Sequence, residues 1–385
     1  MYGILMPGEH VEDGVPVVKV RNIVDGRIDA EQLLRTSREI DSCFERSRLR
    51  GGDILLTIRG TTGRVAVVPP ILEGANITQD TARIRIEDDV VRGYVVHALA
   101  SPYVERQIRL RTIGQAVKGI NIACVRRLQL PMPASRSVQH RLAELFGHLD
   151  RACAAVGRAV HAKRRLKLSL LQQLVQGAGE GDGYRVRSRL GDVTRHLTTR
   201  NRGLFGPESV MGVLKSQGLV PMREGTIADD LSAYRRVPPR AFAYNPMRIN
   251  IGSIAYSWHE SDVLVSPDYV VFQCDESKLD PRYLDHLRHT SLWSQFVTAI
   301  GAGSVRVRIY YRDLARFAFP LPSLDEQHRI ASVLDKIDAE IALLNRQLTA
   351  YRTLKRGVMQ KLLTPKSEDE PAVTNTALAT REARA

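Results

Sequence analysis

Cysteine is scarce in this chain of 385 residues, and its four cysteines form no recognisable pattern. Cys43, Cys124, Cys153 and Cys274 lie far apart, without a Cys-x-x-Cys pair or a Cys/His cluster at metal-ligand spacing. This distribution argues against a disulfide framework and against a zinc site, and it is typical of reduced thiols in the cytosol.

Long hydrophobic runs are also missing, as are the features of an exported protein. The first ten residues lack the basic start and the apolar stretch of a signal peptide. We therefore expect a cytoplasmic protein that has no membrane partner.

The common signatures of nucleotide-dependent catalysis do not occur either. There is no Gly-x-x-x-x-Gly-Lys-Ser/Thr loop for a nucleotide phosphate, and no strand is followed by Gly-x-Gly-x-x-Gly. The Asn-Pro-Pro-Tyr or Asp-Pro-Pro-Tyr tetrad, with which amino-group DNA methyltransferases hold the target amine, is absent as well. These absences predict a chain that is not itself an enzyme and carries no catalytic residue, cofactor or metal.

One short pattern keeps a nuclease open as an alternative. Pro267-Asp268 followed by Glu276-Ser277-Lys278 resembles a nuclease motif in which two carboxylates hold a divalent metal and a lysine positions water. However, the equivalent stretch at 78–88 has no matching lysine, and 275–278 is typical of an exposed turn. Because short degenerate patterns often arise by chance, we do not favour this interpretation.

Acidic residues are too few to balance the basic ones. The chain has 56 Lys and Arg against 42 Asp and Glu, which gives a formal net charge of +14. Such an excess favours a polyanion as partner, nucleic acid above all. The alternative is an arginine-rich composition whose charges are scattered over solvated surfaces.

The sequence does contain a long internal repeat. Gln139-His140-Arg141-Leu142 recurs 188 residues later as Gln327-His328-Arg329-Ile330. Upstream the offset becomes 189, with a Pro-x-Pro pair in each copy, and the match extends back to Arg59 and Arg248. So long a period with so few shifts predicts two whole domains rather than a solenoid of small units.

Each copy is predicted to begin as a mixed α/β domain. β-Branched residues between Gly and Pro punctuation predict strands at 17–20, 53–58, 64–68 and 81–86 in the first copy, and at 254–257 and 269–272 in the second. Helical spacing follows at 94–109 and at 281–300.

Each copy is predicted to end in a long helix with a heptad seam. A Ser323-to-Glu326 capping box marks the start of the second helix. The predicted seams are Leu142, Leu145, Leu149, Ala152, Val156, Ala159, Leu166, Leu170 and Leu174 in the first helix, and Ile330, Leu334, Ile337, Ile341, Leu344, Leu348, Tyr351, Val358 and Leu362 in the second. Lys163 and Lys355 interrupt the seams; they either set the register or, as we favour, extend to solvent.

Two seams of equal length favour an α+β chain in which two tandem α/β domains are separated by helices that pack as an antiparallel coiled coil. The two copies are then related by a pseudo-two-fold axis. The predicted order is a first domain at 1–134, a central spacer helix at 135–177, a second domain at 178–322, a C-terminal spacer helix at 323–364 and a disordered tail at 365–385. A simpler alternative is a coiled coil that only holds two unrelated domains.

Several of these segments resemble a known family. Lys118 to Ile122 with Leu130-Pro131-Met132-Pro133, and Phe319 to Ile330 with its Pro-Leu-Pro and Glu-Gln-x-Arg-Ile pattern, resemble the specificity subunit of type I restriction-modification systems. The resemblance implies two target-recognition domains, each of which reads one half of a bipartite, asymmetric site in double-stranded DNA.

The resemblance also implies partners. The helices of such a subunit dock two modification subunits, which carry S-adenosylmethionine and methylate adenine at N6. Restriction subunits join with ATP and magnesium to cleave DNA. In that reading, this chain supplies only the DNA address. The alternative is a stand-alone DNA-binding or scaffold protein without a methyltransferase partner.

Two features depart from the family pattern. The second domain opens with Ser188 to Val193, for which the first domain has no counterpart, so the first domain lacks its opening strand or the true start lies upstream. The first helix has Ser137-Val138-Gln139 where the pattern has Glu-Gln, and it lacks the capping box.

Candidate DNA contacts combine guanidinium, amide and hydroxyl groups with glycines that let the backbone approach a ligand. The alternative is an ordinary turn with arginines that face solvent. The predicted DNA-binding residues are Arg59, Thr61, Thr62, Arg64 and Lys118 in the first copy, and Arg248, Asn250, Ser253, Arg306 and Arg308 in the second. The predicted partner-binding residues are Gln139, Arg141, Gln327 and Arg329.

Overall fold

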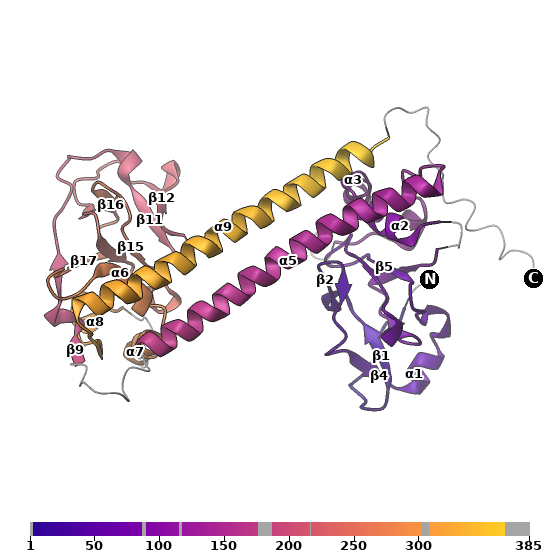
Figure 1. Ribbon diagram of the computed structural model, residues 1–385, viewed down its shortest axis with the longest axis horizontal. Helices are drawn as coiled ribbons and strands as arrows, with labels where there is room; N and C mark the ends of the chain where they lie inside the picture. Colours follow the sequence, from indigo (N-terminus) through magenta and orange to yellow (C-terminus); the bar gives the residue numbers. More distant parts are fainter. Residues whose placement is uncertain are drawn as a thin grey trace, which may run out of the picture. The chain divides into compact units, whose positions relative to one another are not determined.

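The computed structural model describes residues 3–86, 90–114, 118–175, 187–215, 217–301 and 308–365. The chain forms two units: Met1–Gly157 with Arg346–Ala385, here unit 1, and Arg158–Asn345, here unit 2. Two long helices, α5 (Arg136–Val175) and α9 (Leu324–Leu362), each contribute one half to each unit (Figure 1). This division cuts across the predicted domain limits because each domain packs on parts of both helices.

Unit 1 contains two three-stranded sheets. One has the order β6-β5-β8 and is antiparallel; the other has the order β4-β1-β7, with β1 and β7 parallel. Its strands are β1 (Val15–Val18), β2 (Ile23–Val24), β3 (Arg27–Ile28), β4 (Leu34–Thr36), β5 (Ile54–Thr57), β6 (Val65–Val67), β7 (Asn76–Ile77) and β8 (Thr81–Ile84). Its short helices are α1 (Arg38–Ser42), α2 (Arg92–Leu99), α3 (Pro102–Arg111) and α4 (Ile122–Arg126).

The central strand β5 shows why this domain needs an unbroken apolar run. Successive side chains of a strand point to opposite faces of the sheet. Ile54 and Leu56 pack into the core beneath α2 and α5, whereas Leu55 packs into a second core with residues of β1 and β7. Both faces are therefore covered, and all four residues of β5 are buried.

Unit 2 is built around a four-stranded antiparallel sheet with the order β10-β17-β14-β15. The elements of this sheet are β10 (Thr194–Leu197), β14 (Ala241–Tyr244), β15 (Ile254–Tyr256) and β17 (Val270–Cys274). Three smaller pairs are β9 (Arg187–Arg189) with β18 (Ala318–Pro320), β11 (Met211–Leu214) with β12 (Gly218–Pro221), and β13 (Arg235–Val237) with β16 (Val263–Val265). Its short helices are α6 (Pro281–Leu287), α7 (Ser291–Gly301) and α8 (Tyr311–Leu314).

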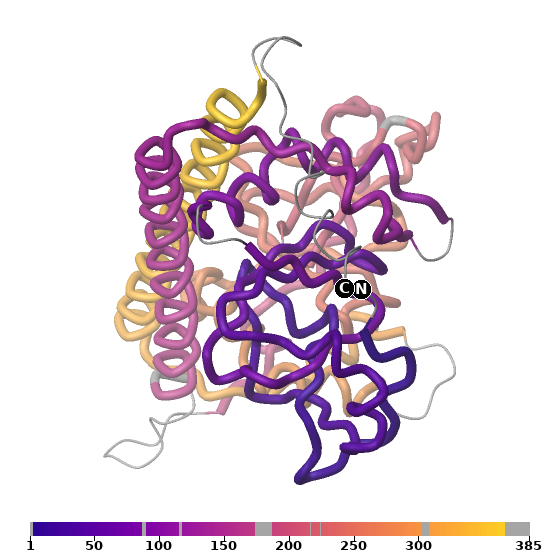
Figure 2. The backbone as a smooth tube through the Cα atoms, turned by 90° about the vertical axis from the view of Figure 1, so that its right-hand side faces the viewer, coloured from indigo at the N-terminus to yellow at the C-terminus, as the bar shows by residue number. Residues whose placement is uncertain are grey.

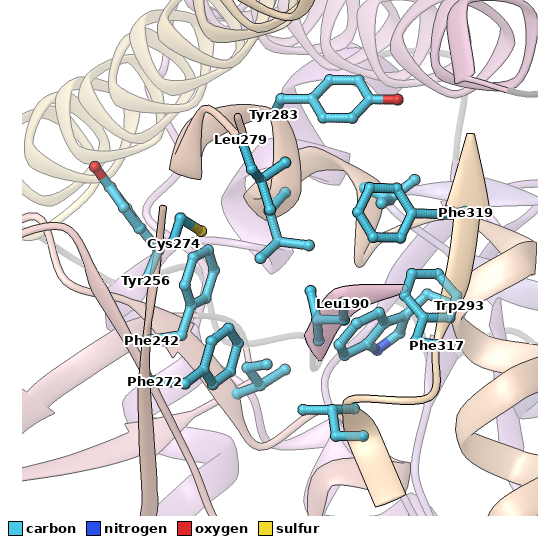
Figure 3. Packing of buried hydrophobic residues seen from close by; sticks show 14 of the residues in the cluster. Leu190, Phe242, Tyr256, Phe272, Cys274, Leu279, Tyr283, Trp293, Phe317 and Phe319 are labelled. Atoms are coloured by element: carbon cyan, nitrogen blue, oxygen red, sulfur yellow. The ribbon is translucent and has the colours of Figure 1, made fainter. Parts of the chain in front are cut away.

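The core of unit 2 is rich in aromatic rings. Phe242 and Phe272 stack with their ring centroids 5.1 Å apart, and Trp293 meets Phe317 edge to face at 5.0 Å. Figure 3 shows these rings with Leu190, which lies next to the rings carried by the β18 segment. Large rings bury much apolar surface and fix the geometry of their neighbours, so α6, α7 and the sheet form one packed body.

The predicted helices 94–109 and 281–300 are each broken in two, which corrects the expectation of single helices. Pro102 has no N–H to donate and begins α3, while the hydroxyl of Ser101 accepts the N–H of Val104 at 3.4 Å. In unit 2 the hydroxyl of Thr290 accepts the N–H of Trp293 at 3.3 Å. A capping residue at the same place in both copies therefore turns the chain between two short helices.

The described residues of unit 1 contain no counterpart of β9, β18 or β10. In unit 2, β9 pairs with β18 at one end of the domain, and β10 covers the edge of β17. At the position equivalent to β18, the side-chain amide of Gln107 instead donates to the carbonyl of Gln129 at 2.8 Å and accepts its N–H at 3.0 Å. A side chain thus takes the place of a paired strand.

Parts of α5 and α9 lie antiparallel within each unit. In unit 1 the first half of α5 lies beside the second half of α9, and in unit 2 the second half of α5 lies beside the first half of α9 (Figures 1 and 2). As predicted, the hydroxyl of Ser323 caps α9 by accepting the N–H of Glu326 at 3.3 Å. Among the described residues, no helix is long and apolar enough to cross a membrane.

The buried stripe of the helices differs from the predicted heptad seams. Leu145, Leu166 and Leu362 are exposed, which corrects three predicted seam positions. The buried side chains are instead Phe146, Val160 and Leu171 of α5, Ala331, Met359 and the correctly predicted Ile330, Leu334 and Ile337 of α9, and Leu363 just after it. The stripe is rotated because each helix packs on a globular core as well as on the other helix.

Candidate nucleic-acid interface

Each unit has a surface groove at the same place in the repeat. The groove of unit 1 has a volume of about 510 Å³ and that of unit 2 about 550 Å³. Ile58, Gly119 and Asn121 line the first, and the residues 189 positions later, Met247, Arg308 and Tyr310, line the second. The repeat therefore carries the same groove twice, with different side chains.

Similar backbone contacts, shifted by one residue between the two copies, build the grooves. The N–H of Ile120 donates to the carbonyl of Ile58 at 2.8 Å, and the N–H of Ile309 donates to the carbonyl of Pro246 at 3.0 Å. Ile120 and Ile309 are both buried, so they anchor the segment that follows the helix α3 or α7. Their neighbours on either side are left at the surface of each domain.

The groove of unit 1 is lined by two arginines and aliphatic side chains. Arg59 is exposed, and its backbone forms an isolated bridge with Gly119, whose missing side chain leaves room for the Arg59 stem. Arg111 and the exposed Ile113 lie at the end of α3 and just after it. Two guanidiniums beside apolar groups suit phosphate contacts and a thymine methyl or guanine edge.

The groove of unit 2 is more aromatic and more basic. Tyr310 is half exposed, and Tyr311 stacks on His196 with ring centroids 5.0 Å apart and planes 15° apart. The hydroxyl of Tyr311 also donates to the carbonyl of Thr194 at 2.9 Å, which fixes the ring against β10. Aromatic faces next to cationic groups are common where proteins meet nucleic acid.

Four cationic or titratable groups surround one carboxylate in this groove: Arg235, Arg308, Arg312 and His196 lie with Asp268. Burial and the neighbouring Arg200 lower the pKa of Arg235, although Asp268 opposes this effect. Burial and Arg235 also lower the pKa of His196. Crowded positive charges are stabilised by an incoming anion, so the electrostatics favour phosphate as ligand.

The predicted DNA-binding residues of the first copy divide into surface and structural groups. Arg59, Thr61 and Lys118 are exposed, Thr62 is half-buried, and all four belong to the segments around the groove. Arg64 instead donates from Nη1 to the carbonyl of Ile23 at 2.9 Å, so its guanidinium also holds the backbone of β2.

The predicted residues of the second copy divide in the same way. Arg248 and Asn250 are exposed around a short turn at 249–251, and Arg308 lies in the groove. Ser253 is only 7% exposed. Arg306 lies outside the described residues.

The two glutamines predicted to bind a partner lie inside the protein. Gln139 is 6% exposed and Gln327 fully buried. The amide of Gln139 accepts the N–H of Val91 at 3.1 Å and donates to the carbonyl of Pro133 at 2.9 Å. Gln327 accepts the N–H of Asp280 at 2.8 Å and donates to two carbonyls, those of Lys278 and Pro322, at 2.9 Å each.

These bonds give both glutamines an internal role. Each connects the first turn of a long helix to the start of the domain helix α2 or α6. We call Gln139 and Gln327 the glutamine latches. The neighbouring Arg141 and Arg329 are exposed and are the members of the predicted partner-binding set that point outward.

The sequence alone does not single out several groove residues, namely Arg111, His196, Tyr310, Tyr311 and Arg312. Their signal is weak because they come from three separate segments that only the fold brings together. Tyr310 could have been found from the repeat, since it stands where the first copy has Asn121 next to the matched Ile120 and Ile309.

The nuclease-like pattern does not converge on one site. Asp268 precedes β17 and Glu276 follows it, so a strand that rises about 3.3 Å per residue separates the two carboxylates by more than roughly 15 Å. Glu276 pairs with Arg240 at 2.9 Å, and Lys278 pairs with Asp275 at 3.4 Å. Among the described residues, no group of three or more His, Cys, Asp or Glu side chains could hold a metal.

Comparisons with known proteins agree with this architecture. Residues 242–350 match the family model described as the type I restriction modification DNA specificity domain. The specificity subunit of the EcoBI type I restriction enzyme from Escherichia coli is 29% identical over 180 residues, which cover 46% of this chain and 38% of that protein. The putative MjaX specificity subunit of Methanocaldococcus jannaschii is 20% identical over 381 residues, 92% of this chain and 87% of that protein.

Two solved structures share the fold. The S subunit of a type I restriction-modification system from M. genitalium superposes with a TM-score of 0.58 at 12% identity, covering 95% of this chain and 94% of that one. A chain from a structural study of the assembly and conformational transition of the type I restriction-modification system gives a TM-score of 0.53 at 17% identity, covering 93% of this chain and 95% of that one.

Proposed function

We propose that this chain, which belongs to the family of type I restriction-modification DNA specificity subunits, reads a bipartite, asymmetric DNA site with its two domains. The observation that carries the proposal is the pair of grooves at equivalent positions of the repeat, lined by different side chains. Two equivalent reading positions with different chemistry suit two half-sites of different sequence.

The charge of the chain supports DNA as the ligand. A formal net charge of +14 provides the attraction for phosphates on which most protein–DNA affinity depends. Arg59 and Arg248, with Arg308, are exposed at or beside the grooves, where they can contact phosphates or the edge of guanine. Binding should therefore weaken steeply as the salt concentration rises.

The long helices give the proposal a spacer. A 40-residue α-helix at 1.5 Å per residue is about 60 Å long, and α5 and α9 have 40 and 39 residues. We infer that they hold the two domains at a set separation, so that the half-sites have a preferred spacing. Their exposed basic side chains, Arg141 and Arg329 among them, form the surface on which two modification subunits dock.

The chain itself acts without catalysis. In the assembly we propose, the modification subunits carry S-adenosylmethionine and methylate adenine, and restriction subunits with ATP and magnesium cleave DNA. The crowded positive charges of the unit 2 groove suit binding of an anion, and its single carboxylate is a poor ligand set for a metal.

A binding selection tests this function. The chain of 385 residues, assembled with modification subunits from its source organism, is incubated with random double-stranded DNA, and the retained fraction is sequenced. We expect two different short motifs separated by a constant number of unspecified base pairs. Recovery of a single continuous motif, or of no motif at all, would contradict the proposal.

A further inference from the structure

A cluster of one histidine, one aspartate and one lysine joins three elements in each unit. In unit 1, which holds the first cluster, Asp150 of α5 pairs with Lys355 of α9 and lies 3.7 Å from the Nδ1 atom of His97 on α2. The lysine and the aspartate come from different long helices, so the cluster connects both helices to the domain.

The second cluster repeats this arrangement in unit 2 with the helices exchanged. Lys167 of α5 contacts the two carboxylate oxygens of Asp338 of α9 at 2.7 and 2.5 Å. Asp338 lies 4.0 Å from Nδ1 of His286 on α6, and a carboxylate oxygen of Asp335 accepts from Nε2 of the same ring at 2.8 Å. All three cluster positions match those of the first cluster at the offsets of the repeat.

Both lysine–aspartate pairs have the same antiparallel register. In an antiparallel helix pair with one constant register, the residue numbers of facing partners add up to the same value. This holds for Asp150 with Lys355 and for Lys167 with Asp338. A neighbouring pair, Lys163 with Glu340 at 2.5 Å, lies within one helical turn of that register. Lys163 and Lys355 interrupt the predicted apolar seam, and both pair across the helices instead of extending to solvent, contrary to our expectation.

We propose that the two clusters select the register of α5 against α9 and thereby the spacing of the two half-sites. This inference rests on the proposed function for its effect on DNA, but the register itself is a property of the chain. Polar side chains inside a helix interface are a known means of specifying register.

A shift by one heptad leaves every cluster charge without an opposite charge. In one direction Asp150 meets Leu348 and Lys167 meets Ala331; in the other direction they meet Leu362 and Asn345. Lys355 then meets Ala143 or Gly157, neither of which carries a charge. Apolar contacts between small and aliphatic side chains discriminate poorly between such registers, whereas partly buried charges strongly disfavour the loss of a partner.

The lysine side of each cluster is largely buried. The side chains of Lys167 and Lys355 are 18% and 22% exposed, whereas their partners Asp338 and Asp150 are 46% and 47% exposed. His97 and His286 are buried and lie between the domain and the ion pair of each cluster. Exposed ion pairs have little effect on specificity, but pairs at this depth are less screened by solvent.

A shifted register would change the separation of the half-sites. Seven residues at 1.5 Å each move one helix by about 10 Å along the other, which corresponds to roughly 3 base pairs of DNA. The cluster residues do not touch DNA in this proposal; they position the domains that do.

Charge exchange provides the test. Asp150→Lys places two lysines opposite each other, whereas Asp150→Lys combined with Lys355→Asp restores an opposite pair in the original register. Arg356→Gln is the matched control, because Arg356 is the next residue of α9 and pairs only at the surface, with Glu105 at 3.1 Å. Lys355→Met removes one charge without repulsion, in case the reversed variant does not fold.

The first readout needs no DNA. Spin labels on Ser169→Cys and Ala339→Cys, both exposed positions of the helix pair, report the register in a chain whose native cysteines are replaced. We expect one distance in the starting chain, in the exchanged pair and in the control, and a second population about 10 Å away in Asp150→Lys or Lys355→Met. A single unchanged distance in all folded variants would overturn the proposal.

The second readout uses DNA with varied spacing between half-sites. Asp150→Lys should accept spacings altered by about 3 base pairs while the half-site sequences stay the same, and the exchanged pair should restore the original spacing. Failure of the unsubstituted chain to bind any bipartite site would contradict the proposed function, yet the label distances would still decide whether the clusters set the register.

Discussion

Where each domain meets its long helix, unit 2 has a network of charges and unit 1 has two glycines. Arg282 of α6 pairs with Asp280 at 2.9 Å and with Asp335 of α9 at 3.5 Å. The equivalent positions of Arg282 and Asp335 in unit 1 are Gly93 and Gly147. The same junction therefore has ion pairs in unit 2 and, in unit 1, a glycine of α2 that packs against Ala143 of α5.

A side chain at Gly93 would be crowded. A Cβ atom added to Gly93 would lie 3.3 Å from the Cβ atom of Ala143, so α2 and α5 are already in tight contact. What both junctions share is the glutamine latch and a tyrosine, Tyr94 or Tyr283, whose hydroxyl donates to the carbonyl of Pro131 or Pro320. The comparison indicates that these shared bonds, more than the variable charges, hold each domain to its helix.

Removing the glutamine latches should give the largest effects. Gln327→Leu leaves three buried backbone groups without a partner and should cost about 3–4 kcal/mol of unfolding free energy in unit 2. Gln139→Leu leaves two such groups and should cost about 2–3 kcal/mol in unit 1. Urea unfolding followed by intrinsic fluorescence and circular dichroism measures both.

The exposed Gln360 of α9 is the matched control for the latches, since Gln360→Leu should change stability by less than about 0.5 kcal/mol. Equal small losses in all three variants would show that the latches do not hold the domains.

The first cluster makes unit 1 sensitive to acid. Burial and the charge of Lys355 lower the pKa of His97 to about 4, although Asp150 opposes this. In the unfolded chain the pKa of histidine is about 6.5, so the unfolded state binds a proton that the folded state excludes. Stability from this group is complete above pH 6.5 and falls as the pH drops towards 4, by about 2 kcal/mol at pH 5.

His97→Gln tests this prediction by removing the titrating group. The difference in unfolding free energy between pH 7 and pH 5 should shrink by about 2 kcal/mol relative to the unsubstituted chain. An identical pH dependence in both proteins would exclude His97 as the source.

Much of the fold follows from the sequence because its signals are local or repeated. The limits of α9 follow from Ser323 and Pro365, and the strands β5, β6 and β8 follow from β-branched runs between glycines. The paired motifs around Gln139 and Gln327 locate the two junctions. Each of these features depends on residues that are close together in the sequence or that recur in the repeat.

What the sequence did not reveal depends on contacts between distant segments. Phe146 and Leu171 are buried because a domain core packs against the side of α5. The heptad pattern of one helix predicts only the side that faces the other helix. The sequence predicts a partner-binding role for the two glutamine latches, because a glutamine at a helix start gives no sign of its burial. The hydrogen bond from Arg64 to the carbonyl of Ile23 likewise joins segments that are distant in the sequence.

The two grooves offer a comparison of function. Arg59 and Arg248 occupy equivalent positions, so Arg59→Ala and Arg248→Ala should each weaken recognition of one half-site only, by roughly 1–2 kcal/mol. Binding selections with each variant measure this loss as relaxed sequence preference in one motif.

Arg38→Ala on α1 removes a similar exposed charge that does not line the groove. It should weaken binding slightly without changing either motif. Equal relaxation of both motifs by Arg59→Ala would contradict a separate role for each unit.

The smallest expected effect comes from placing in unit 1 a carboxylate that unit 2 has at the equivalent position. Gly147→Asp places a carboxylate where Asp335 meets His286, and an opposite charge near His97 should raise its pKa by roughly one unit, about 1.4 kcal/mol. The Nη1 atom of Arg151 lies 3.4 Å from the added Cβ and will offset part of the effect. An NMR titration of the His97 ring measures the shift.

Gly157→Asp serves as the control, because this position lies ten residues further along the same helix and nothing stands within 4 Å of its added Cβ. It leaves the net charge of the protein equal to that of Gly147→Asp. If the pKa of His97 moved equally in both variants, the shift would reflect the overall charge of the protein. A local effect of the residue at position 147 on His97 would then be excluded. A shift in Gly147→Asp alone would show that a carboxylate at this position acts locally on His97.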